Sequence, residues 1–171
     1  MQITCNTSTM ELEDLPLDIG YASEPVTLTG SDGKRSTVGG QNGKTQLIVT
    51  APFIDDAFIE ELRVIDRELP AGGEYEVTAA LVVANATHVD PGLERFDFYV
   101  DSDGEFGDWY GVRLVGDPCD GELTKALILI SKDGAIFYDE FADNLHHRFN
   151  TDTLLRKIAA AQTCYTGKGC H

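Results

Sequence analysis

The stretch TQLIVTAPFIDDAFIEELRVID, residues 45–66, decides the expected fold of this chain. Its first six residues are a short apolar run rich in β-branched side chains, which predicts a buried strand. Asp55 or Asp56 can then cap a helix, and Pro70 ends it. The helix is amphipathic, with an apolar stripe at spacings of three and four and charged residues expected largely on the other side: Phe58, Leu62, Ile65 and Leu69 against Glu60, Glu61, Arg63 and Asp66.

Strands and helices continue to alternate on both sides of this unit. Before it we expect an N-terminal hairpin around Asn6, within residues 2–17, a brief strand at 25–29 and a glycine-rich loop at 30–43. After it come strands at 76–84 and 96–100, a hairpin of 125–131 with 135–141, and a helix that begins at Asp152. This order predicts an α/β protein: a thioredoxin-like mixed sheet flanked by helices, with an N-terminal β-hairpin.

Length and charge limit the functions that this chain can have. A chain of 171 residues with 42% apolar content suits one domain, which we place at residues 1–160, followed by a Cys- and His-containing tail at 161–171. The 29 acidic residues against 13 basic ones give a formal charge of −16, which argues against nucleic acid and anionic membranes as partners. Neither a secretory signal nor a membrane-spanning run is visible, so we expect a highly soluble cytoplasmic protein.

Three segments resemble the thiol peroxidase family, the atypical 2-Cys peroxiredoxins, in family order. Pro52, Ile54 and Asp55 match the motif P-S-I-D-T-x-V-C. Residues 105–112, EFGDWYGV, resemble the family's E-F-x-x-x-Y-G-V helix and turn, and residues 121–140 are similar to the hairpin that contains G-L-x-x-R-A-V-V-V-I-D. The resemblance covers about residues 2–160 and implies the peroxiredoxin variant of the thioredoxin fold.

The residues that carry the family's chemistry differ in this chain. Asp56 takes the threonine position, and the reactive cysteine falls on Ile59 without a gap or on Phe58 with a shift of one residue. Neither side chain can become a nucleophile. Lys125 takes the arginine position and keeps the charge without the planar fork. Pro52 alone is retained, and residues 85–98, where the resolving cysteine would lie, contain no cysteine.

These differences predict a pseudoenzyme that does not reduce peroxide by the family mechanism. Asp55, Asp56 and Lys125 are expected to converge at the helix start, and we favour an Asp56–Lys125 ion pair over a new acid–base site.

The four cysteines are scattered, which indicates reduced thiols rather than a disulfide framework. Cys5 is expected to be a small hydrophobic residue in a strand. Cys119 is the candidate for a relocated redox thiol; the alternative, which we favour, is a partly exposed thiol whose pKa is raised by neighbouring aspartates.

The tail supplies the remaining candidate groups. Cys164 and Cys170 are a candidate redox pair, since glycines at 167 and 169 let the chain turn back and a disulfide form. With His171 they are also candidate metal ligands, and a fourth ligand could come from His146, His147 or a partner subunit. The alternative is a disordered tail without function. No other cofactor is expected, and His88, His146 and His147 are expected to be ordinary surface residues.

The sequence therefore leaves three hypotheses. The first is a thiol-peroxidase-like homodimer whose redox role rests on Cys164 and Cys170, with Cys119 as a further candidate, exchanging a disulfide with a thioredoxin-like reductant. The second is a non-enzymatic dimeric scaffold or binding module. The third is a metal-binding protein that uses Cys164, Cys170 and His171.

Overall fold

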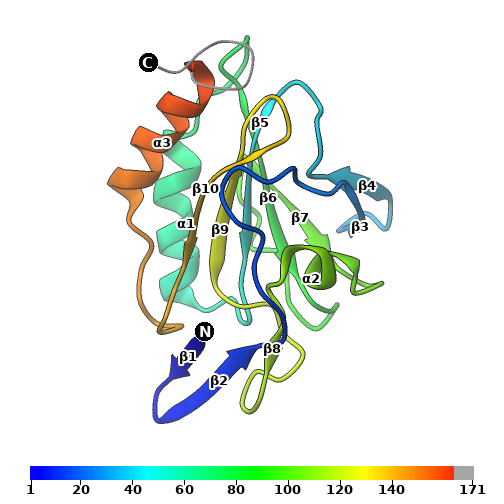
Figure 1. Ribbon diagram of the computed structural model, residues 1–171, viewed down its shortest axis with the longest axis vertical. Coiled ribbons are helices and arrows are strands. Elements are labelled where there is room, and N and C mark those ends of the chain that lie inside the picture. Colours follow the sequence, from blue (N-terminus) through cyan, green and yellow to red (C-terminus); the bar gives the residue numbers. More distant parts are fainter. Residues whose placement is uncertain (164–171) are drawn as a thin grey trace.

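A computed structural model describes residues 1–163 of the chain. Its centre is a seven-stranded mixed sheet in the order β10-β9-β5-β6-β7-β3-β4, and a second sheet has the order β1-β2-β8 (Figure 1). The strands are β1 (Gln2–Cys5), β2 (Ser8–Leu12), β3 (Val26–Gly30), β4 (Arg35–Val38), β5 (Thr45–Thr50), β6 (Val77–Val83), β7 (Phe96–Val100), β8 (Leu114–Val115), β9 (Ala126–Ile130) and β10 (Ile136–Phe141). The helices are α1 (Asp56–Glu68), α2 (Glu105–Tyr110) and α3 (Thr151–Thr163). The expected α/β fold with an N-terminal hairpin is confirmed.

Strand β5 is an interior strand of the large sheet, third in the order, and all six of its residues are buried. It pairs in parallel with β6 and antiparallel with β9. Both faces of the sheet are covered, which explains why this strand is a continuous apolar run rather than an alternating one. Its carboxyl end and the amino end of β9 lie side by side, because Thr50 is opposite Ala126.

Helices α1 and α3 cover one face of the sheet (Figure 1). Asp55 is the N-cap of α1, and its carboxylate accepts a hydrogen bond of 2.9 Å from the Phe58 amide. The predicted apolar stripe is confirmed, since Phe58, Leu62, Ile65 and Leu69 are all buried. Placing Glu61 and Asp66 on the outer side was wrong, because they are 2% and 8% exposed. Asp66 is buried where its carboxylate accepts the amides of Glu94 and Arg95 at 3.2 and 2.7 Å.

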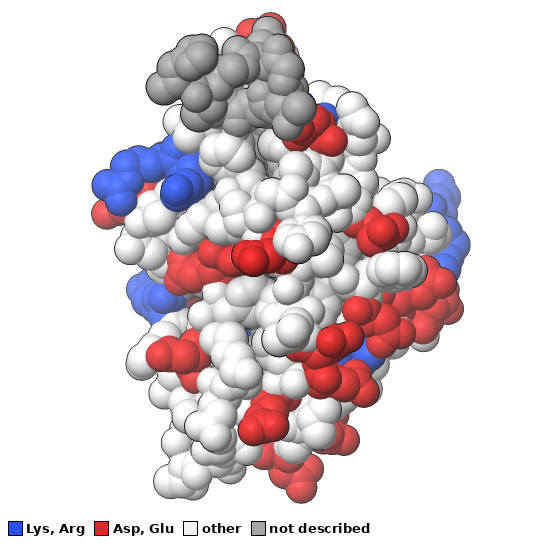
Figure 2. Space-filling model, in the orientation of Figure 1, with Lys and Arg blue, Asp and Glu red and all other residues white. Residues whose placement is uncertain are grey.

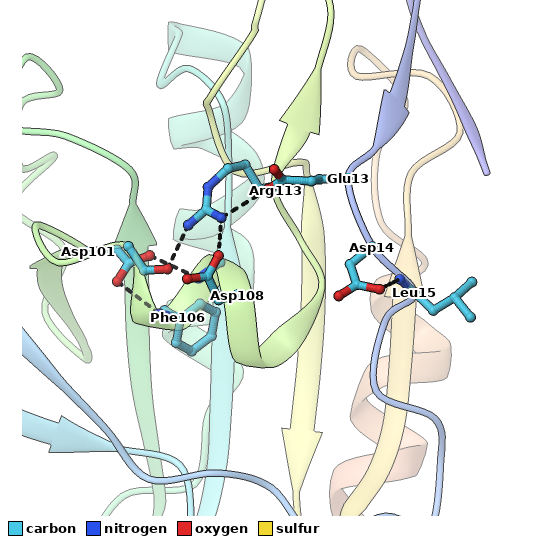
Figure 3. A network of polar contacts seen from close by, with 9 residues as sticks. Glu13, Asp14, Leu15, Asp101, Phe106, Asp108 and Arg113 are labelled. Carbon is cyan, nitrogen blue, oxygen red and sulfur yellow. Dashed lines mark hydrogen bonds and ion pairs between the residues drawn. The ribbon is translucent and has the colours of Figure 1, made fainter.

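Helix α2 packs against the other face of the sheet through Phe106 and Tyr110, whose rings stack at 4.2 Å. Asp101 accepts the amides of Phe106 and Gly107 at the start of α2, both at 2.9 Å. Arg113 then ties the helix to the N-terminal segment: it bonds Asp108, the Gly104 carbonyl at 2.6 Å and Glu13 at 3.1 Å (Figure 3). Asp101 and Arg113 therefore fix the position of α2.

The N-terminal hairpin forms as predicted, with Cys5 paired to Ser8 and Asn6 at a φ of 54°. Asparagine tolerates this left-handed conformation, which the tight turn requires. The two residues of β8, which the sequence did not reveal, add a third strand to the hairpin.

Two other boundaries differ from the expectation. Strand β4 lies inside the glycine-rich stretch expected to be loop, because Arg35–Val38 pairs with β3 through contacts such as Val26 with Val38. Helix α3 begins at Thr151 rather than Asp152, and Asn150 accepts the Thr153 amide at 3.0 Å.

The visible surface is acidic, as the composition requires. Figure 2 shows acidic side chains spread over this face, with Lys and Arg mostly toward its edges. No helix within residues 1–163 has the length and apolar content needed to cross a membrane.

Replacing Gly111 should destabilise the fold more than replacing Gly121. Both glycines have a positive φ, but only Gly121 has free space around the position of an added Cβ. Gly111 has a φ of +66°, and a Cβ there would lie 2.2 Å from the Leu15 carbonyl oxygen. Gly121 has a φ of +81° with nothing within 4 Å. We expect Gly121→Ala to lower the free energy of unfolding by about 1 kcal/mol, from backbone strain alone. Gly111→Ala should lower it by about 3 kcal/mol or more. Urea unfolding measures the free energy of unfolding of each variant. Equal losses for the two variants would contradict a steric clash between the added Cβ and Leu15.

Candidate functional site

A small cavity opens where β5 leads into α1. Its volume is about 160 Å³, and the residues that line it include Pro52, Phe53, Asp55, Phe58, Lys125 and His146. The carboxyl ends of parallel strands are the usual ligand-binding edge of an open α/β sheet. The cavity is therefore the candidate functional site. Of the positions singled out from the sequence, Pro52, Phe58 and Lys125 line it, whereas Asp56 and Ile59 do not.

Lys125 closes the inner end of this cavity with a buried ion pair. It directly precedes β9, and its Nζ lies 2.7 Å from Oε1 of Glu61 on α1. The two side chains are 6% and 2% exposed. The same Nζ donates a hydrogen bond of 2.6 Å to the carbonyl oxygen of His147. Charges buried to this degree are tolerated only when they are paired and hydrogen-bonded, as they are here.

Two aromatic rings and one backbone amide complete the surroundings of this pair. The Lys125 Nζ lies 5.1 Å from the centre of the Phe58 ring and 5.0 Å from that of Phe149. Both distances fall within the range of a cation–π contact. The second oxygen of Glu61 accepts a hydrogen bond from the Phe149 amide. Both carboxylate oxygens of Glu61 are thus engaged, which leaves Glu61 poorly suited to transfer protons to a ligand.

The predicted Asp56–Lys125 ion pair was wrong, because the partner of Lys125 is Glu61. Asp56 is exposed in the first turn of α1, and the cavity is lined by Asp55 instead. Sequence reasoning missed Glu61, although a signal was present: it follows Phe58 by three residues and precedes Ile65 by four, which places it on the apolar face.

Apolar side chains occupy both positions that could align with the family's cysteine. Phe58 is 4% exposed and belongs to the main core, and Ile59 is partly buried. None of the described residues that line the cavity is a cysteine. The geometry therefore supplies a neutralised cation and an aromatic ring at this place, and no thiol among the described residues that line it.

The segment from Asp143 to Phe149, which closes the cavity, is held by the N-terminal hairpin. The Thr4 amide donates to the Asp143 carbonyl at 2.8 Å, and the Leu145 amide donates to the Thr4 carbonyl at 2.9 Å. Strand β1 thereby fixes the segment whose His147 carbonyl and Phe149 amide contact the ion pair.

Two free thiols lie in the apolar cluster that Leu145 of this segment also joins. Cys5 and Cys119 are 6% and 8% exposed and belong to one apolar cluster with Leu114 and Leu145. The Cys5 Sγ lies 3.7 Å from Nε2 of His146. Cys119 is buried rather than partly exposed, and it does not line the cavity. Burial raises the pKa of its thiol above the ordinary value, with smaller contributions from Cys5 and Glu122.

The three histidines expected to be ordinary surface residues all have a polar partner, although His146 and His147 are exposed as expected. His88 Nε2 lies 2.8 Å from Glu122, and the side chains are 13% and 19% exposed. Asn85 donates to the other oxygen of Glu122 at 2.9 Å, which joins the loop after β6 to the loop before β9. His146 contacts Cys5 and also packs on Phe53, at a ring distance of 5.6 Å. The Nδ1 of His147 lies 3.4 Å from Asp143, and both of these side chains are largely exposed.

Cys164, Cys170 and His171 lie outside the described residues. Within residues 1–163 there is no group of three or more His, Cys, Asp or Glu side chains that could hold a metal ion. A tail disulfide and a tail metal site both stay predictions.

The sequence and the structure are both similar to thiol peroxidases, and the structure is also similar to a peroxiredoxin-like protein. No family model matches the chain. The sequence is 24% identical to a thiol peroxidase of Mycobacterium bovis over 146 residues, which are 83% of this chain and 88% of that protein. The structure is similar to a peroxiredoxin-like protein from Aquifex aeolicus, with a TM-score of 0.82 and 18% identity over 94% of this chain and 96% of that one. A thiol peroxidase from Chromobacterium violaceum gives a TM-score of 0.79 and 16% identity, over 94% and 97% of the two chains.

Removing one member of the buried Lys125–Glu61 pair should lower the free energy of unfolding far more than removing both. Lys125→Met leaves Glu61 buried without its cation, so we expect the free energy of unfolding to fall by about 3–5 kcal/mol. The double variant Lys125→Met with Glu61→Leu should recover most of this loss, because matched apolar groups often replace buried pairs at little cost. Urea unfolding of the two single variants and the double variant gives the coupling energy.

Asp56→Asn is the matched control, because Asp56 is exposed at the same helix start. It should change the free energy of unfolding by less than about 0.5 kcal/mol. Additive losses in the double variant, or a large loss for Asp56→Asn, would contradict the assignment of Glu61 as the partner.

Proposed function

We propose that this chain, which belongs to the thiol peroxidase and peroxiredoxin family and has its thioredoxin-like fold, does not reduce peroxide by the family mechanism. The observation that carries the proposal is the buried Lys125–Glu61 pair beneath the Phe58 ring. A peroxide-reducing site of this kind needs a thiolate at the helix start and a cation free to stabilise it. Here a phenyl ring stands in the place of the thiol, and Glu61 neutralises the cation.

We further propose that the fold serves as a homodimeric binding module in the cytoplasm. Several large apolar side chains are exposed on the N-terminal segment and on α2, among them Leu15 at 85% and Trp109 at 54%. These segments touch, since the Leu15 carbonyl lies against Gly111, which directly follows α2. Exposed apolar side chains on adjoining segments support an interface. The acidic surface would repel nucleic acid and anionic membranes, so neither is a good candidate partner.

The thiol redox and metal-binding hypotheses for the tail stay predictions. Cys164, Cys170 and His171 lie outside the described residues, so only their spacing in the sequence supports a disulfide exchanged with a thioredoxin-like reductant or a metal site. A reversible loss of two thiols would favour the first, and an ion removed by chelator would favour the second.

Restoring a thiol at position 58 tests the proposal directly. The wild-type chain, given hydrogen peroxide and dithiothreitol, should consume peroxide no faster than the same chain unfolded in urea. Phe58→Cys alone should gain little, because Glu61 neutralises Lys125. Adding Glu61→Gln frees the cation while keeping the shape of the side chain. The double variant should react with peroxide at least about tenfold faster than Phe58→Cys, because a nearby free cation lowers a thiol pKa.

Circular dichroism and thermal unfolding establish that each variant is folded before its rate is compared. Glu61→Gln in the wild-type background is the matched control and should leave peroxide consumption unchanged. Peroxide turnover by the wild-type chain far above that of the unfolded chain, which survives Cys→Ser changes at all four cysteines, would contradict the proposal.

The homodimer has a separate test. Sedimentation equilibrium should give twice the chain mass of 18.7 kDa. A charge at the interface should dissociate the dimer, so Trp109→Asp should give a monomer of unchanged secondary structure. Val89→Asp is the control, because Val89 is 78% exposed on a different loop. A monomeric wild-type chain, or a dimer that is unaffected by Trp109→Asp, would overturn the interface.

A further inference from the structure

A second and larger groove lies between the end of α1 and the end of α3. Its volume is about 500 Å³. The residues around the end of α1 form one wall and α3 forms the other: Glu68, Pro70 and Tyr75 against Leu155, Ile158, Ala159, Gln162 and Thr163. The two helices lie side by side on one face of the large sheet (Figure 1). The lining is mostly apolar, and neither the family resemblance nor the proposed function uses this groove.

The wall of the groove at the end of α3 is held in place by hydrogen bonds. The Gln162 side chain is 6% exposed, and its Oε1 accepts a hydrogen bond of 2.9 Å from the Thr45 hydroxyl on β5. Its Nε2 donates to the Tyr75 carbonyl at 2.8 Å. These bonds join the last turn of α3 to β5 and to the loop after α1. A groove that is already ordered loses little conformational freedom on binding, which favours its occupation.

The chain itself continues from this groove. Thr163 is the last residue that the structure describes, and it lines the groove. It is followed by residues 164–171, with the sequence CYTGKGCH. Along α3 the groove extends from Leu155 to Thr163, which is about 12 Å at about 1.5 Å per residue. The eight residues that follow span up to about 26 Å when extended. A segment that turns back after Thr163 therefore reaches the whole groove.

The composition of this segment suits the groove. Tyr165 supplies an aromatic ring with a polar hydroxyl, a side chain that can bury its apolar part and keep its polar end in water. Lys168 supplies a positive charge that complements Glu68 in the groove wall. Gly167 and Gly169 let the backbone approach a surface closely, because they have no side chain. The segment thus offers one apolar anchor and one complementary charge.

We propose that residues 164–171 dock in this groove of the same chain, with the Tyr165 ring against Leu155 and Ile158. The inference is independent of the proposed function, because it needs neither peroxide chemistry nor a dimer. A covalently attached segment has an effective concentration on the order of millimolar at its groove, which a second copy or another protein in dilute solution does not reach. The segment closes the groove, and an outside partner has to displace it.

Limited proteolysis of the full chain tests the docking. Trypsin cleaves after Lys168 only when the segment is free, so the cleavage rate measures the undocked fraction. The reference is a free peptide of residues 161–171, AQTCYTGKGCH, and dithiothreitol keeps all thiols reduced. We expect the wild-type chain to be cleaved at least about tenfold more slowly than this peptide, because burial of one aromatic ring favours the docked form by at least this factor.

Two variants remove the docking from opposite sides. Tyr165→Ala removes the ring, and Ala159→Glu places a charge at an exposed position in the groove wall. Each should raise the cleavage rate at least about tenfold, whereas Tyr165→Phe should keep the protection. The matched controls are Thr166→Ala in the segment and Lys157→Glu, which is exposed on α3 and does not line the groove. Both controls should leave the rate nearly unchanged, and circular dichroism establishes that each variant is folded.

Nuclear Overhauser effects identify the contact itself. We expect them between the ring protons of Tyr165 and the methyl groups of Leu155 and Ile158. A mixture of isotope-labelled and unlabelled chains separates contacts within one chain from contacts between two chains.

Distinct outcomes overturn the inference. Cleavage of the wild-type chain as fast as the peptide would show that the segment is free, and equal protection of the Tyr165→Ala and wild-type chains would exclude the ring as the anchor. Protection that is lost on dilution, or Overhauser effects only between chains, would place the segment in the groove of a second copy. Trp109→Asp, which tests the proposed dimer interface, should leave the protection unchanged, so the two proposals fail separately.

Discussion

The buried ion pair between Lys125 and Glu61 is the interaction on which the candidate site depends. It joins α1 to the residue before β9, and through His147 and Phe149 it fixes the segment that leads to α3. Taking two charges out of water costs several kcal/mol for each, so the pair persists only because its hydrogen bonds and ring contacts are complete. The same completeness leaves little of its charge available to a ligand. The pair thereby supports the packing of α1 against β9 and the segment before α3.

The segment at 143–149 links the two chemical features of the molecule. On one side its backbone contacts the ion pair, and on the other His146 contacts the thiol of Cys5. The hairpin holds it in place, since Thr4 bonds both Asp143 and Leu145. A short N-terminal element therefore has a strong influence on the geometry of a cavity formed by residues far along the chain. His146 thereby connects the cavity with the buried cluster that contains Cys5 and Cys119.

The helices and strands around β5 could be predicted because short sequence patterns indicate each of them. The β-branched run, the Asp55 cap and the apolar stripe of α1 each reflect a preference of a few neighbouring residues. Strand β4 was missed because its pairing with β3 comes from a return of the chain across a glycine-rich turn, where local preference favours a loop. The contacts of His88 and His146 were missed for a related reason: their partners lie 34 and 141 residues away in the sequence.

The sequence by itself determined the α/β architecture, the absence of cysteine between residues 45 and 66, and the acidic character of the surface. These follow from composition and from periodicities that short segments express locally. Only the tertiary structure decided that Lys125 pairs with Glu61 rather than Asp56, and that Cys5 lies beside an imidazole. Both outcomes depend on which face of α1 turns toward β9 and on which loop the hairpin covers. The packing of whole helices and strands determines these contacts. A buried charge or thiol can interact only with the groups that this packing places next to it.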